Sequence, residues 1–101
     1  MKIQITKTDI KRGRKYDANG CPIARAVKRE MRKQGKNPKN YMIDVTSVLQ
    51  VHKIVRDGAR IVGLEPEISK SLPENGRKFV EAFDQYGEVK PFTLELVGVE
   101  L

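Results

Sequence analysis

Four glycine-containing breaks set the order of helices and strands that this chain can adopt. Asn19-Gly20 and Asp57-Gly58 are strong turn dipeptides, and Gly35 and Gly87 each follow a helical pattern, where a C-terminal glycine is expected. Asp57-Gly58 is the strongest hairpin signal, because both central residues of a type I′ turn need positive φ. The breaks therefore predict short elements with a hairpin near the middle of the chain.

Alternation of polar and apolar residues predicts the strands. The expected strands cover residues 2–6, 41–46, 48–56, 59–64 and 92–97, and residues 66–71 are expected to form a connection. The strongest alternation lies in the last of these strands, which reads Phe-Thr-Leu-Glu-Leu-Val.

Apolar residues at helical spacing predict two helices. The first begins at Pro22 and ends at Gly35; the second is capped by Ser71 and ends at Gly87. Thr8 is expected to cap a single turn. Because helices and strands mix without a βαβ repeat, the prediction is an α+β fold. It has two helices packed on a small antiparallel or mixed sheet of four to five strands, in a single domain over residues 1–101.

A small hydrophobic core follows from this arrangement. The residues expected to be mostly buried are Ile3, Ile5, Val27, Met31, Val55, Ile61, Phe79, Phe83, Phe92 and Leu94.

Positive charge is concentrated in the first part of the chain. Residues 1–40 hold 13 Lys and Arg against three acidic residues, a net +10, whereas residues 41–101 hold seven against ten, a net −3. The formal charge of the whole chain is +7. Such asymmetry favours a basic surface that meets a polyanion; the alternative is a solubilising surface that the acidic part of the chain neutralises in the folded state.

The cations fall into a loop cluster and a helix face. The candidate nucleic-acid-binding residues are Lys11, Arg12, Arg14, Lys15, Arg25, Lys28, Arg29, Arg32 and Lys33. Those from 25 to 33 follow i, i+3, i+4 spacing and share one broad face, which suits a phosphate backbone. Tyr16 and Tyr41 flank the cluster and are candidates for base stacking, with ordinary packing as the alternative.

Two segments carry a resemblance. The front reads Asp9-Ile10, then Gly13, then Cys21-Pro22-Ile23-Ala24. The back contains Leu72-Pro73, Phe83-Asp84 and Pro91-Phe92-x-Leu94-x-Leu96. Together they resemble small, largely uncharacterised proteins of tailed bacteriophages. The resemblance implies a phage origin and a place in the host cytoplasm, without a particular chemistry.

Catalytic and cofactor chemistry finds little support in the residues. His52 is the only histidine and Cys21 the only cysteine, so no nucleophile–base pair, zinc set or disulfide is expected. Cys21 precedes Pro22 at a helix start, which could favour a thiolate; the favoured interpretation is a small buried side chain. We expect a protein that is not an enzyme and that uses no cofactor or metal.

The functional hypothesis is therefore binding of a polyanion, most simply nucleic acid. Two alternatives stay open: an inhibitor or adaptor that engages an acidic host protein, for example a component of host defence, or a site that sequesters a nucleotide signal. No apolar run is long enough to cross a membrane, and no secretion signal is visible, so we expect a cytoplasmic protein without a membrane partner.

Overall fold

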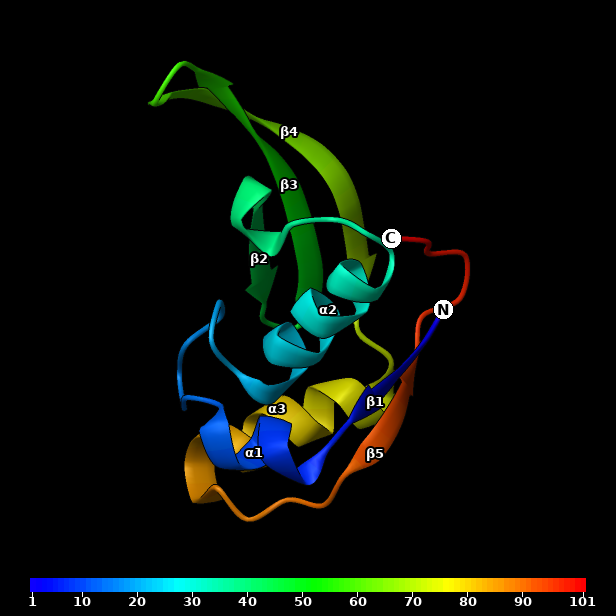
Figure 1. Cartoon of the computed structure of the whole chain (residues 1–101). Coiled ribbons are helices and arrows are strands. Elements are labelled where there is room, and N and C mark those ends of the chain that lie inside the picture. The colour runs from blue at the N-terminus through cyan, green and yellow to red at the C-terminus, as the bar shows by residue number, and fades with distance from the viewer.

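The computed structural model describes residues 1–101 as a body of helices and a two-stranded sheet, from which a long hairpin projects (Figure 1). The strands are β1 (Lys2–Ile5), β2 (Tyr41–Val45), β3 (Val48–Asp57), β4 (Arg60–Ser71) and β5 (Phe92–Glu95). The helices are α1 (Lys7–Arg12), α2 (Pro22–Lys33) and α3 (Glu74–Tyr86), with a 3-10 turn, η1, at Pro38–Asn40.

The α+β class predicted from the sequence is confirmed, but the strands form two sheets and not one. β1 and β5 run antiparallel to each other and form the first sheet, in which Ile3 lies opposite Leu94. β2, β3 and β4 form a second antiparallel sheet in that order. The chain ends hold the first sheet together: the Met1 amino group donates a hydrogen bond of 2.8 Å to the Leu96 carbonyl. The short turn expected after β1 is a third helix, α1.

The cap of α1 differs from the prediction by two positions. Thr6, not Thr8, is the N-cap, and its hydroxyl accepts from the Asp9 backbone N–H at 3.2 Å. The Asp9 carboxylate accepts in turn from the Thr6 N–H at 2.9 Å. This reciprocal capping box satisfies two backbone donors that a helix start leaves free. It also fixes Asp9 at the point where α1 meets α2.

Helix α2 follows the sequence prediction closely. Pro22 is its first residue and Cys21 its N-cap, and Gly35 lies just beyond it with φ of 78°. Its apolar side is buried against β1, β2 and α1, which leaves the charged side outward. The later helix begins at Glu74 after an N-cap at Pro73, because Ser71 still belongs to β4. Gly87 ends it with φ of 74°, as predicted.

The hairpin is longer than the sequence indicates. β4 runs through Pro66 to Ser71, where a connection was expected. Pro66 fits because β4 is an edge strand and the register with β3 shifts there, leaving Glu67 unpaired as a bulge. At the tip of the hairpin, Gly58 has a φ of 61°. The φ of Ala59 is not positive, although a type I′ turn needs a positive φ at both central residues. Positive φ at the first central residue alone is the pattern of type II′.

The core lies between α2, α3 and the inner faces of both sheets. Seven of the residues predicted to be buried are buried: Ile3, Ile5, Val27, Met31, Phe79, Phe83 and Leu94. Three predictions were wrong. Val55 is half-buried and Ile61 is 59% exposed, because the outer part of the hairpin extends beyond the helices that would cover it. Phe92, the first residue of β5, is half-buried at the margin of the core, where its ring lies 4.7 Å from that of Phe79.

Candidate nucleic-acid interface

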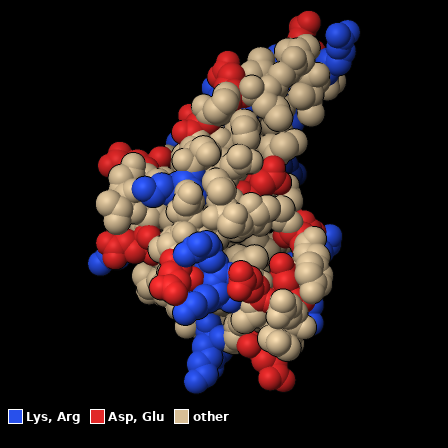
Figure 2. All heavy atoms as spheres, turned by 180° about the vertical axis from the view of Figure 1, so that it is seen from behind, with Lys and Arg blue, Asp and Glu red and all other residues tan.

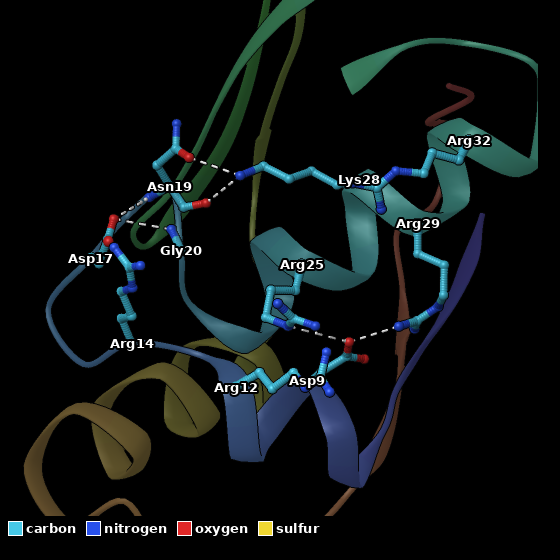
Figure 3. Close-up of a pocket in the computed structure, with 10 residues that line it drawn as sticks. All are labelled: Asp9, Arg12, Arg14, Asp17, Asn19, Gly20, Arg25, Lys28, Arg29 and Arg32. Carbon is cyan, nitrogen blue, oxygen red and sulfur yellow. Dashed lines mark hydrogen bonds and ion pairs between the residues drawn. The ribbon is translucent and has the colours of Figure 1, made fainter. Parts of the chain in front are cut away.

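A charged hollow of about 510 Å³ lies between α2 and the segment that joins α1 to it (Figure 3). No apolar residue lines it. The lining residues are Asp9, Arg12, Arg14, Asp17, Asn19, Gly20, Arg25, Lys28, Arg29 and Arg32. Six cations and two carboxylates give the lining a formal charge of +4.

Asp9 forms the floor of the hollow and is 1% exposed. Its Oδ1 accepts from Arg29 Nη1 at 2.7 Å and lies 3.9 Å from Arg25 Nε. Burial alone would raise the pKa of Asp9, but the hydrogen bonds from Arg29 and Thr6 outweigh it and lower the pKa below its ordinary value. A carboxylate that is ionised at neutral pH therefore ties two arginines of α2 to α1.

Arg29 and Arg25 are held differently by this carboxylate. Arg29 also donates to the Gln4 carbonyl through Nη2, so both its terminal nitrogens have protein partners. The Nε of Arg25 is buried and has no hydrogen-bond partner, and its only ion pair is with Asp9. Arg25 is consequently oriented by Asp9 while part of its donor capacity stays unused.

Lys28 closes the hollow on the side of the α1–α2 loop. Its Nζ donates to the Asn19 carbonyl at 2.7 Å and to Asn19 Oδ1 at 2.8 Å. Asp17 Oδ1 accepts from the backbone N–H groups of Asn19 and Gly20, both at 3.0 Å, which shapes this turn. Burial lowers the pKa of Lys28, and the negative charge of Asp17, which raises this pKa, has a smaller effect. Lys28 thus joins the loop to α2.

Arg12, Arg14 and Arg32 line the hollow without any ion pair or side-chain hydrogen bond within the chain. All three are exposed and come from three different elements: the end of α1, the loop and the second half of α2. Figure 3 shows Arg12 near Asp9, Arg14 on the opposite side near Asp17, and Arg32 on the last turn of α2. They are the guanidinium groups available to an external anion.

Six of the nine predicted binding residues lie together at the hollow. Arg12, Arg14, Arg25, Lys28, Arg29 and Arg32 line it. Lys11, Lys15 and Lys33 do not: the Lys15 side chain lies beside Gly87 at the end of α3, and Lys33 pairs with Glu30 at 3.7 Å. A helix face spreads its side chains through a wide arc, and only part of that arc turns toward the α1–α2 loop.

The residues of the lining that are not cations were not identified from the sequence. Asp9, Asp17 and Asn19 organise the cations but were not assigned to the site. A signal for Asp9 exists: Thr6-x-x-Asp9 has the spacing of a capping box, which would have placed a carboxylate at the α1 terminus.

The two tyrosines considered for base stacking do not line the hollow. Tyr16 is exposed with a positive φ of 55°, and its backbone N–H donates to Asp84 at 2.9 Å, which ties the loop to α3. Tyr41 is half-buried at the start of β2. Neither ring is placed to stack on a base held in the hollow.

Cys21 is buried, as the favoured interpretation predicted. Its Sγ accepts from the Ala24 N–H at 3.4 Å as the cap of α2. Burial raises the pKa of the thiol, more than the helix N–H groups lower it, so the thiolate considered for this position is not favoured.

Other faces of the molecule have a different character. Viewed from behind, acidic and basic groups intermingle over the lower body, and a broad uncharged surface runs up the hairpin (Figure 2). No helix has the length and apolarity required to cross a bilayer. Comparison of the chain with protein-family models, curated proteins and solved structures finds no match.

Proposed function

We propose that this chain is a non-enzymatic nucleic-acid-binding protein whose charged hollow takes phosphates of the backbone. The observation that carries the proposal is the lining: six cations, no apolar residue, and three arginines without a partner in the chain. Cations that crowd one surface repel one another, and a bound polyanion relieves that repulsion while releasing its own condensed counterions.

The composition of the lining favours recognition of the backbone over recognition of bases. Aromatic rings are the main surfaces on which proteins stack bases, and the hollow has none. Arginine guanidinium groups match phosphate oxygens with two parallel hydrogen bonds. We therefore propose binding that depends little on nucleotide sequence.

The resemblance to phage proteins sets the proposed context. The protein would act in the cytoplasm of an infected cell, on host or phage nucleic acid. The alternative partner is an acidic host protein, for example one of a defence system, whose carboxylates could meet the same arginines. A nucleotide signal fits less well, because nothing apolar in the hollow would hold its base.

The test is the salt dependence of binding to a short duplex and a short single strand. Each phosphate contact contributes about −0.7 to −0.9 to the logarithmic slope of the binding constant against salt. Replacing Arg12, Arg14 and Arg32 with Ala should flatten the slope by roughly two to three. The fold should persist, because none of these side chains has a partner in the chain.

A matched control removes the same charge elsewhere. Lys2, Lys53 and Lys90 are exposed, form no ion pair and lie outside the hollow. Their triple Ala variant should keep the wild-type slope to within about one contact. Equal losses in both variants would point to net charge alone and overturn the assigned site. Absence of binding to any DNA or RNA at low salt, with an acidic protein recovered from host lysate after nuclease treatment, would favour the alternative.

A further inference from the structure

The three-stranded sheet has an outer face that no helix covers. Side chains alternate between the faces of a strand, so the register identifies the residues on this side. Ile43 and Val51 point to the core, and their neighbours Met42 and His52 point outward. Figure 1 shows α2 on the inner side, and Figure 2 shows the opposite side as a largely uncharged surface.

Successive cross-strand rows build this outer face. Along β3 the outward residues are Gln50, His52, Ile54 and Arg56. They lie opposite Asp44, Met42, Leu64 and Ile61 on the flanking strands, and Pro66 is the second neighbour of His52. The middle of the face therefore carries mainly apolar side chains. One end carries Gln50 and Asp44, and the other carries Arg56 beside the apolar Ile61.

The apolar side chains of this face form a contiguous exposed group and are not isolated on the surface. Ile61 is 59% exposed, Leu64 43% and Met42 40%. Contiguous exposed apolar side chains with a polar rim are typical of interaction surfaces. The bulges of β4 and Pro66 hinder an added strand at the edge, so contact through the face is the favoured mode.

The charges at the two ends of the face are opposite. Asp44 lies at the end near the body and forms no ion pair. Arg56 lies at the end near the hairpin tip, where it donates to Asn40 Oδ1 at 3.1 Å and to no carboxylate. The two rows are six positions apart along β3, with the apolar rows between them.

We propose that this outer face binds the same face of a second copy of the chain in a two-fold dimer. If the two sheets stack with their β3 strands antiparallel about the level of Lys53, the His52 row meets the partner's Ile54 row. Arg56 then meets the partner's Asp44, twice by symmetry. This self-complementarity is what an isologous interface requires. The unpaired, buried Nδ1 of His52 lies within the same face. The proposal is independent of binding at the hollow.

Sedimentation equilibrium over a wide range of chain concentrations tests it. The wild type should reach twice the chain mass of 11.5 kDa. Leu64→Ser should weaken dimerisation by roughly tenfold or more, since it removes an apolar side chain from the centre twice per dimer. Val97→Ser is the control: Val97 is more exposed but lies outside the sheet, and its change should have no effect.

A charge exchange decides the arrangement. Asp44→Arg alone places two cations opposite each other and should weaken the dimer, whereas Asp44→Arg combined with Arg56→Asp should restore it. Circular dichroism checks that each variant is folded. A wild type that stays monomeric at millimolar concentration would overturn the proposal. A dimer unaffected by Leu64→Ser, or not restored by the exchange, would overturn it equally.

Discussion

Replacing Asp9 with Asn removes the only buried charged side chain while keeping its volume and one acceptor oxygen. The Asn oxygen can still accept the Thr6 N–H, so most of the cap survives. The ion pair with Arg29 is lost, and Arg25 and Arg29 face each other without a counter-charge. Breaking a buried pair costs about 3–5 kcal/mol.

The exposure of the arginines reduces that cost. Their side chains are 34% and 35% exposed, so water partly replaces the carboxylate and we expect a loss of about 2–3 kcal/mol. For a domain near 100 residues this lowers the melting temperature by roughly 10–20 °C. The same change should not weaken nucleic-acid binding in proportion to the loss of stability, because no cation is removed and the formal charge of the hollow rises from +4 to +5.

Thermal unfolding at several pH values measures the effect and its electrostatic origin. The folded-state pKa of Asp9 is lowered, so its stabilisation is complete above the ordinary Asp pKa of about 3.9 and is lost as the pH falls through the folded-state pKa. The gap between wild type and variant should therefore be widest near neutral pH and shrink in acid. Asp57→Asn, at an exposed turn, is the control. Melting of Asp9→Asn within a degree or two of wild type at neutral pH would refute the reasoning.

Three further changes test the packing around this site. Phe83→Ala should cost roughly 3–5 kcal/mol by chemical denaturation, because Phe83 is buried and stacks on Phe79; near-wild-type stability would contradict the helix-on-sheet core. Cys21→Ser should change stability by about 1 kcal/mol or less, because the hydroxyl keeps the cap but is buried; rapid alkylation of the native thiol at neutral pH would contradict its burial and raised pKa. Gly13→Ala should cost about 1–3 kcal/mol, since a Cβ there would lie 2.6 Å from the Pro22 ring; an unchanged midpoint would show that the α1–α2 junction can yield.

Local signals explain which parts of the fold the sequence could predict. Helix α2 is marked at both ends by Pro22 and Gly35, and Gly87 marks the end of α3, so these boundaries depend on neighbours in the chain. The tip of the hairpin was located correctly, whereas its turn type was not, because the central pair is Gly58-Ala59. β4 exceeded its prediction because Pro66 is tolerated at an edge bulge.

Long-range pairing explains what the sequence could not show. Alternation indicates that Ile61 shares a face with its neighbours, but not whether anything covers that face. Likewise, the spacing of cations on α2 predicts a basic surface, but not that Asp9, twenty residues before Arg29, selects which of them converge. The division of five strands into two sheets also depends on contacts between the two ends of the chain.

Binding of an anion in the hollow should stabilise the folded chain, because the cations that line the hollow converge only in the folded state. A ligand that binds only the folded chain stabilises it by about 2.7 kcal/mol at a hundred times its dissociation constant. Because the hollow lies between α1, the loop and α2, an anion there would bridge three segments that Asp9 and Lys28 already join within the chain. The melting temperature of the chain therefore measures ligand binding directly. Added polyphosphate should raise the melting temperature, and the size of the rise gives the affinity of the hollow.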